Sequence, residues 1–244
     1  MKPFEHKEID ESGKQILESI GNAECFNKWM YHAIKPWCKG KVLEIGSGIG
    51  NISRFLIDDG FQIVLSDLRK DYFSELSEKF SGKKELLGID QMDIVDPQFS
   101  TKFQHLKESF DTIFALNVVE HIFDDELAIK NCKSLLKPGG NLIILVPAYQ
   151  WLYSPIDASL EHYRRYTKKN MTSVFLKNKF QIIHQQYFNF MGIWGWLLFG
   201  KILKHDTLKS GQMRLYSKFV PVFKIIDKLI FNSMGLSVII VGKK

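Results

Sequence analysis

The sequence predicts an α/β fold, a doubly wound sheet with helices on both faces, from three observations. Short apolar segments alternate with segments of helical periodicity at a spacing of about 25–30 residues, as in repeated strand–helix units. The apolar segments show almost no alternation between polar and apolar residues, which is typical of parallel strands buried on both faces. Glycine and proline mark the ends of several segments.

Each element follows from local pattern. Two N-terminal helices are expected between about residues 11 and 37, the second with Phe26, Trp29 and Ile34 at helical spacing. Gly60 closes a later helix, and the run Lys137 to Gly140 (KPGG) predicts a turn that ends another. The remaining helices are expected over 51–58, 71–80, 124–136 and 167–178, and the strands over 41–45, 61–66, 85–89, 110–116, 141–146, 180–188 and 236–241.

The C-terminal part of the chain differs in character from the rest. Residues 189–235 are aromatic, basic and mostly helical in pattern, and a last strand follows them. We therefore expect a helical N-terminal segment at 1–40, a sheet domain formed by 41–188 and 236–244, and a helical insertion or lid at 189–235.

Charge is divided unevenly along the chain. The net charge is +6, but residues 162–244 carry 15 Lys and Arg against 2 acids, so the first 161 residues are net negative. A basic third favours an anionic membrane surface, phosphate-bearing ligands or nucleic acid. The three cysteines are scattered, the first residues lack the apolar core of a secretory signal, and a cytoplasmic location is expected.

The segment from Val42 to Gly50 (VLEIGSGIG) is an apolar strand followed by the glycines Gly46, Gly48 and Gly50. Their spacing is G-x-G-x-G, whereas a dinucleotide fingerprint requires G-x-G-x-x-G. No Gly-Lys-Ser/Thr loop for a triphosphate is present either. Glu44 at the tip of the strand would repel a pyrophosphate but favour an ammonium group, so the turn suits a ligand with positive charge and no phosphate.

Two further acids follow predicted strands. Asp67 ends the second strand, where a carboxylate can accept hydrogen bonds from both hydroxyls of a ribose. Asp93 follows the third strand and is placed to meet an adenine amino group across the same crevice.

These motifs, taken in order, resemble class I S-adenosylmethionine-dependent methyltransferases over about residues 25–150. The glycine segment resembles their first motif, Ser66-Asp67 the second, Met92 to Ile94 the adenine motif, Leu116 to His121 the fourth, and Leu136 to Gly140 the turn before the fifth strand. The fourth motif is most similar to the branch that contains the ubiquinone-biosynthesis methyltransferases and related bacterial small-molecule enzymes. The resemblance implies a Rossmann-like seven-stranded sheet with an antiparallel last strand and a helical insertion between the last two strands.

By the same resemblance the cofactor is S-adenosyl-L-methionine. The implied cofactor-binding residues are Phe26, Glu44, Gly46, Ser47, Gly48, Gly50, Asp67, Leu68, Asp93, Ile94 and Asn117. For Phe26, plain packing between helices is an equal alternative.

Acceptor residues are expected after the fourth and fifth strands, where the crevice of such a sheet opens. His121 is one candidate for a catalytic role, with the start of the next helix as its alternative. The other is Glu161 to Tyr166 (EHYRRY), in which His162 is the candidate base and Arg164, Arg165 and Tyr166 are candidates for substrate binding. A solvated turn before a helix is the alternative. No group of residues has metal-ligand spacing, so no metal site is expected.

The predicted function is methyl transfer from S-adenosylmethionine to a small or lipid-like, anionic acceptor. The apolar run at residues 188–200 is too short to span a bilayer, but with the lysines that follow it suits a helix at the inner membrane surface or a substrate channel. Methylation of RNA is the alternative reaction, and a non-catalytic cofactor-binding partner subunit is the alternative of another class. The sequence does not determine the oligomeric state.

Overall fold

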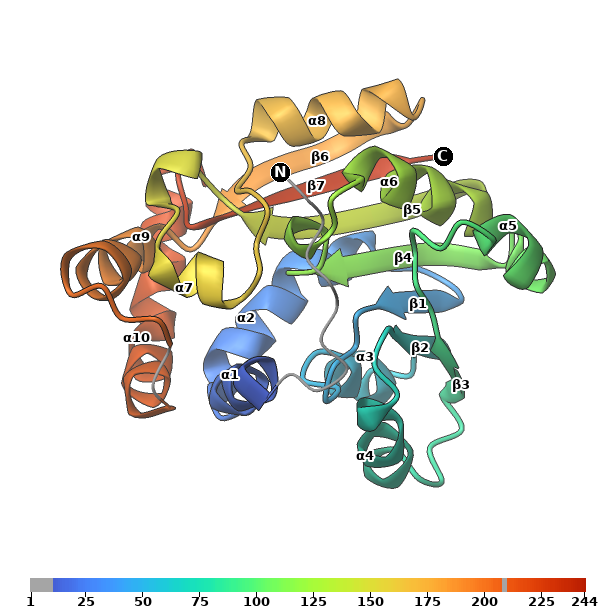
Figure 1. Ribbon diagram of the computed structural model, residues 1–244, viewed down its shortest axis with the longest axis horizontal. Coiled ribbons are helices and arrows are strands. Elements are labelled where there is room, and N and C mark those ends of the chain that lie inside the picture. The colour runs from blue at the N-terminus through green and yellow to red at the C-terminus, as the bar shows by residue number, and fades with distance from the viewer. Residues whose placement is uncertain (1–10, 208–209) are drawn as a thin grey trace.

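The computed structural model describes residues 11–207 and 210–244, in which seven strands form one mixed sheet (Figure 1). The strand order is β3-β2-β1-β4-β5-β7-β6, so the winding direction reverses between β1 and β4. Strands β1 to β5 are parallel, and β7 is antiparallel to both of its neighbours, β5 and β6. The strands are β1 Val42–Ile45, β2 Ile63–Asp67, β3 Leu86–Gln91, β4 Phe110–Leu116, β5 Leu136–Pro147, β6 Gln181–Phe188 and β7 Ser237–Lys243. The predicted fold class is confirmed.

Helices cover both faces of the sheet. One apolar cluster joins alternate residues of the central strands to α5 (Phe99–Lys102), α6 (Asp125–Leu135) and α8 (Lys168–Lys177). The other joins the opposite face to α2 (Glu24–Ile34), α3 (Ser53–Asp58), α4 (Asp71–Lys79) and α10 (Ser210–Leu229). Because the central strands are buried on both sides, their continuous apolar pattern follows from this arrangement. The helix α1 (Glu11–Gly21) precedes α2.

The start of β5 differs from the sequence prediction. The helix α6 ends at Leu135, and the strand begins at once at Leu136 instead of at residue 141. Phe110 pairs with Leu136 and Thr112 pairs with Asn141, so residues 137–140 form a bulge within the β4–β5 ladder. Gly139 has φ +78°, a left-handed conformation that favours glycine. The run KPGG therefore bends the strand where a free turn was expected.

The insertion between β6 and β7 consists of α9 (Phe190–Trp196), a π-helical turn η5 (Leu197–Ile202) and α10. Asp227 on α10 is buried and accepts hydrogen bonds from the backbone N–H groups of Asn189 and Phe190, at 2.6 and 2.9 Å. This carboxylate ties the start of α9 to α10. Figure 1 shows α9, α10 and the short α7 (Pro155–Ser159) beyond the carboxyl ends of β4 and β5. None of the described helices is long and apolar enough to cross a membrane.

Candidate active site

A cavity of about 620 Å³ lies at the carboxyl ends of the parallel strands. One part of its wall is formed by the glycine loop and the ends of β2 and β3, around Gly46, Asp67 and Asp93. The other part is formed by the turn after β4, the loop after α7 and the insertion, around His121, His162 and Trp196. The topological reversal between β1 and β4 opens the sheet at this edge, which is where ligands bind in such folds.

The glycine loop is shaped by the protein's own packing as well as by any ligand. Gly46 has φ +72°, and a Cβ placed on it would lie 2.4 Å from a methyl group of Val118. Gly50 has φ +73°, and its Cβ would lie 2.7 Å from the ring of Phe80. Both positions therefore require glycine for two reasons, the left-handed backbone and the close neighbour. Gly48 shares this conformation and its N–H points at the Asp67 carboxylate.

Glu44 lines the cavity but is almost fully buried. Its carboxyl group accepts a short hydrogen bond from the Ser53 hydroxyl. Burial raises the pKa of Glu44 to about 8, against the hydrogen bonds from Ser53 and Ser47. At pH 7 the Glu44 carboxyl group is therefore neutral. It orders the base of the glycine loop and does not supply the negative charge for an ammonium group that the sequence predicts.

The Asp67 carboxylate accepts two backbone hydrogen bonds and can accept more. Its Oδ2 accepts from the Gly48 N–H at 2.9 Å and its Oδ1 from the Arg69 N–H at 3.0 Å. A carboxylate has about four acceptor sites, so two remain for the hydroxyls of a ribose at the cavity wall. Asp93 is held in the same way, with Oδ1 accepting from the Val95 N–H at 2.9 Å. This donor and acceptor set fits the nucleoside part of S-adenosylmethionine.

The other implied cofactor residues line the same cavity, apart from Gly50, which is not part of its wall. Asn117 is in the left-handed region at φ 54° just after β4, which exposes its side chain at the strand end. Phe26 lines the cavity and also packs edge-on against Trp29 and Tyr216, so it belongs to both the wall and the helix interface. Ser47, Leu68 and Ile94 complete the lining.

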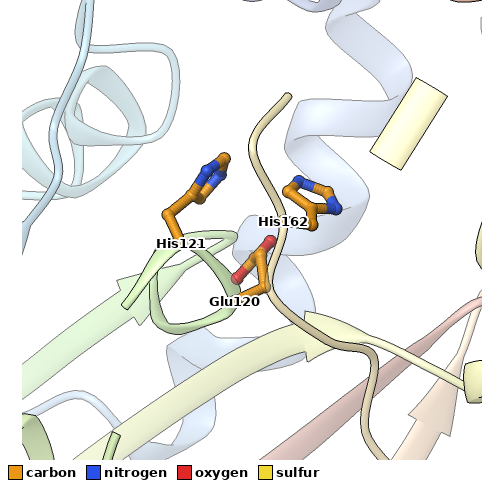
Figure 2. A group of neighbouring side chains, drawn as sticks. All are labelled: Glu120, His121 and His162. Carbon is orange, nitrogen blue, oxygen red and sulfur yellow. The ribbon is translucent and has the colours of Figure 1, made fainter. Parts of the chain in front are cut away.

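Three chemically active side chains meet at the other end of the cavity. Glu120 and His121 lie in the turn η3 (Val119–His121), and His162 lies in the loop after α7. The backbone N–H of Tyr163 donates to the Glu120 carbonyl at 2.8 Å, which joins the two segments. The imidazoles of His121 and His162 are edge to face with centroids 4.6 Å apart. Figure 2 shows the Glu120 carboxyl group directed toward the two rings.

Asp157 accepts hydrogen bonds from several residues in and around the loop after α7. Its Oδ1 accepts from Nδ1 of His162 at 2.9 Å and from Nε of Arg165 at 2.8 Å, and its Oδ2 accepts from the Ser154 N–H at 2.9 Å. Burial acts to raise the pKa of Asp157, but the bond from His162 and the charge of Arg165 outweigh it and leave the pKa below its ordinary value. Burial lowers the pKa of His162 despite Asp157. His162 is therefore neutral at pH 7, with its proton on Nδ1 and its Nε2 lone pair available.

Of the three residues expected to bind substrate, only Arg165 lines the cavity. Arg165 lines the cavity, but its guanidinium is committed to Asp157, to the Ala148 carbonyl and to the face of Trp196. Arg164 pairs with Asp125 at 3.2 Å and donates to the Phe123 carbonyl, and it does not line the cavity. The Tyr166 hydroxyl is buried against Asp125 at 2.9 Å and does not line it either. Arg164 and Tyr166 therefore lie outside the cavity lining, and both side chains bind Asp125 of α6.

Several residues at this end were not predicted from sequence. Glu120 lies within the fourth motif and Asp157 precedes the EHYRRY segment, and neither is among the predicted site residues. The cavity wall also includes Trp196 and Phe199 of the insertion and Tyr216 of α10. The aromatic run before residue 200 contains Trp196 and Phe199 and indicates an apolar wall but no particular contact, whereas Tyr216 lies outside this run.

Comparison with known proteins agrees with this geometry. Residues 43–142 match the family model described as a methyltransferase domain. A highly reducing polyketide synthase of Pyrenophora dematioidea is 29% identical over 124 residues, which are 47% of this chain. The chain spans only 5% of the length of that synthase.

Solved structures show the same fold at low identity. Phosphoethanolamine N-methyltransferase 2 of Haemonchus contortus, solved in complex with S-adenosyl-L-methionine, gives a TM-score of 0.59 at 17% identity, over 88% of this chain and 52% of that one. A putative sarcosine dimethylglycine methyltransferase of Galdieria sulphuraria gives 0.60 at 14% identity, over 90% of this chain and 85% of that one. Residues 43–142 thus resemble a methyltransferase domain, and these solved structures share the fold of the chain.

Proposed function

We propose that the protein binds S-adenosylmethionine beside Asp67 and transfers its methyl group to a small or lipid-like acceptor at the histidine end of the cavity. The observation that carries this proposal is that one cavity contains both the acidic glycine-loop end and the end lined by His121 and His162. The methyltransferase family match supports the reaction class. When bound, the cofactor supplies a methyl group already activated on a positively charged sulfur.

The residues of this chain then position the two partners and exclude water. Asp67 and Asp93 fix the nucleoside end, and Phe26, Trp196 and Tyr216 surround the cavity with apolar surface. Orientation of an acceptor atom toward an activated methyl group is itself a large source of rate acceleration. The neutral His162, with Nε2 available, is the group best suited to interact with the acceptor atom.

A lipid-like acceptor is favoured by the insertion. Trp196 and Phe199 line the cavity, while Trp194 and Leu198 of the same helical segment are exposed. The helix α10 likewise places Tyr216 on the cavity and leaves Leu215 exposed. Apolar side chains of these helices thus both line the cavity and reach the surface, as suits a molecule that leaves a lipid surface for the cavity.

The basic charge of the last third is the observation that favours RNA as the alternative acceptor. Incubating a cell extract with the protein and methyl-labelled cofactor, followed by separation into lipid, RNA and soluble small-molecule pools, distinguishes the two. Label in the lipid or small-molecule pool supports the proposal, and label confined to RNA contradicts it.

Cofactor binding is tested separately by calorimetry with S-adenosylhomocysteine. Asp67→Asn keeps the shape of the side chain but removes its charge, and we expect roughly tenfold weaker binding because hydrogen bonds to charged groups contribute about 1.5–3 kcal/mol. Asp58→Asn is the matched control, since Asp58 is at the end of α3 and outside the cavity lining. Absence of binding by the unmodified protein would refute the proposal, including the alternative of a non-catalytic cofactor-binding subunit.

A further inference from the structure

The cluster of Glu120, His121 and His162 has the composition of a metal site. Each residue offers one ligand atom, and these atoms all lie within 4.8 Å of one another. In a tetrahedral site with bonds of about 2.0–2.2 Å, ligand atoms lie roughly 3.4 Å apart, so small side-chain rotations would bring the three onto one ion. The sequence gives no hint of this, because 41 residues separate His121 from His162.

Glu120 supplies an independent indication of a ligand. Its side chain is fully buried, and within the described part of the chain neither carboxyl oxygen has a hydrogen-bond partner. Buried carboxyl groups are nearly always hydrogen-bonded or bound to a cation, because an unpartnered one loses its solvation without compensation. One of these oxygens lies on the side of the imidazoles in Figure 2, which is where a cation would lie.

The second layer of contacts has the arrangement that metal-binding histidines require. Nδ1 of His162 donates to Asp157, which fixes the tautomer and leaves Nε2 with its lone pair available. Asp157 is in turn held by Arg165 and Ser154, so the imidazole is oriented before any ligand arrives. A carboxylate behind a histidine also makes the ring a stronger ligand.

We propose that Glu120, His121 and His162 bind a divalent transition-metal ion such as Zn²⁺. Two imidazoles and one carboxylate form a ligand set used by catalytic zinc, and all three residues line the cavity. With Glu120 and Asp157 ionised and Arg165 charged, the neighbourhood is net −1 and becomes +1 with the ion. That charge matches an acceptor that binds as an anion, such as a phenolate or an enolate.

The role of the ion at the acceptor rests on the proposed function, whereas metal binding itself does not. With the ion bound, Nε2 of His162 is a metal ligand, and the ion in its place would hold the acceptor oxygen at the histidine end and favour its deprotonated form. Without an ion, Glu120 would remain a buried carboxyl group without a hydrogen-bond partner. Direct measurement of binding separates the two states.

The experiment titrates Zn²⁺ into the chelator-treated protein by calorimetry in the presence of S-adenosylhomocysteine, with Co²⁺ as a spectroscopic probe and Mg²⁺ for comparison. We expect one equivalent of Zn²⁺ to bind, a visible Co²⁺ spectrum with nitrogen ligands, and far weaker binding of Mg²⁺, which prefers oxygen ligands. Glu120→Gln and His162→Gln should each weaken Zn²⁺ binding roughly tenfold or more.

His105→Gln is the matched control, because His105 is exposed in the turn η2 (Gln104–Leu106) and away from the cavity lining. Affinity for S-adenosylhomocysteine reports folding in every variant. No zinc binding by the unmodified protein, or binding that Glu120→Gln and His162→Gln leave unchanged, would overturn the site. If Asp67→Asn loses cofactor binding but still binds zinc, then the cofactor site and the metal site can be tested separately.

Discussion

At the scale of single residues, hydrogen-bond partners distinguish two buried acids of the site. Asp67 lies at the cavity wall with backbone donors on both oxygens, whereas Glu44 lies beneath the loop with hydroxyl partners. The two acids flank the same loop, yet only Asp67 is placed to accept bonds from a ligand as a carboxylate. This difference cannot be read from sequence, where both residues are acids at a strand end.

The raised pKa of Glu44 predicts a pH dependence of stability. Its folded pKa of about 8 is above the ordinary 4.5, so the folded state holds a proton that the unfolded chain releases. The contribution of Glu44 is therefore fully present below about pH 4.5 and is lost as the pH rises toward 8, with a slope of at most about 1.4 kcal/mol per unit. Glu44→Gln should flatten this slope in urea denaturation at pH 5, 6.5 and 8. An unchanged slope would show that Glu44 is ionised in the folded protein.

At the scale of elements, the sequence predicts motifs that are contiguous in the chain, but it does not predict which side chains from separate segments form ion pairs. The glycine loop with Asp67 and Asp93 follows strand ends, and parallel strands bring their carboxyl ends to one edge of a sheet. Arg164 and Arg165 are adjacent in sequence, yet the first pairs with α6 and the second with Asp157 inside the loop. Nothing in local pattern shows that α7 places Asp157 against Arg165, so the sequence does not reveal this internal ion pair.

The helix α10 carries an exposed apolar face that consists of Leu215, Phe219, Val222, Ile225 and Leu229. Their spacing places them on one side of the helix, opposite the buried Val220 and Asp227. The exposed basic residues Arg214, Lys218 and Lys228 lie on the same helix, while Lys209 lies outside the described residues. An apolar face with basic neighbours complements an anionic lipid surface, and we propose that α10 contacts one.

This contact predicts binding to phosphatidylglycerol vesicles in a sedimentation assay. The variant Leu215→Ser/Phe219→Ser should lower binding by about tenfold or more, because each inserted side chain contributes roughly 1.5–3 kcal/mol. Leu176→Ser is the matched control, since Leu176 is an exposed leucine on α8. Equal binding by both variants would locate the contact elsewhere, and a dimer that Leu215→Ser/Phe219→Ser dissociates would assign the face to a second copy of the chain.

At the scale of the whole molecule, residues of the sheet and residues of the helical insertion line one cavity. The cofactor end is built by the strand ends of the sheet, and the acceptor end is completed by the loop after α7 and by the insertion. The domain boundaries inferred from sequence run through this cavity, because the insertion at 189–235 supplies Trp196, Phe199 and Tyr216 to its wall. Changes in the insertion should therefore affect the acceptor without affecting the cofactor.

Gly195 offers a direct test of this division. It lines the cavity from α9, and a Cβ placed there meets nothing within 4 Å, so a larger side chain has room without backbone strain. Gly195→Leu should occupy part of the acceptor end and lower methyl transfer to extract by roughly tenfold, while affinity for S-adenosylhomocysteine stays unchanged. Gly211→Leu is the control, because Gly211 has equally open surroundings on α10 but lies outside the cavity lining. A loss of cofactor affinity in Gly195→Leu would mean that the cofactor extends to α9, and the acceptor would then have to bind on the opposite side of His162.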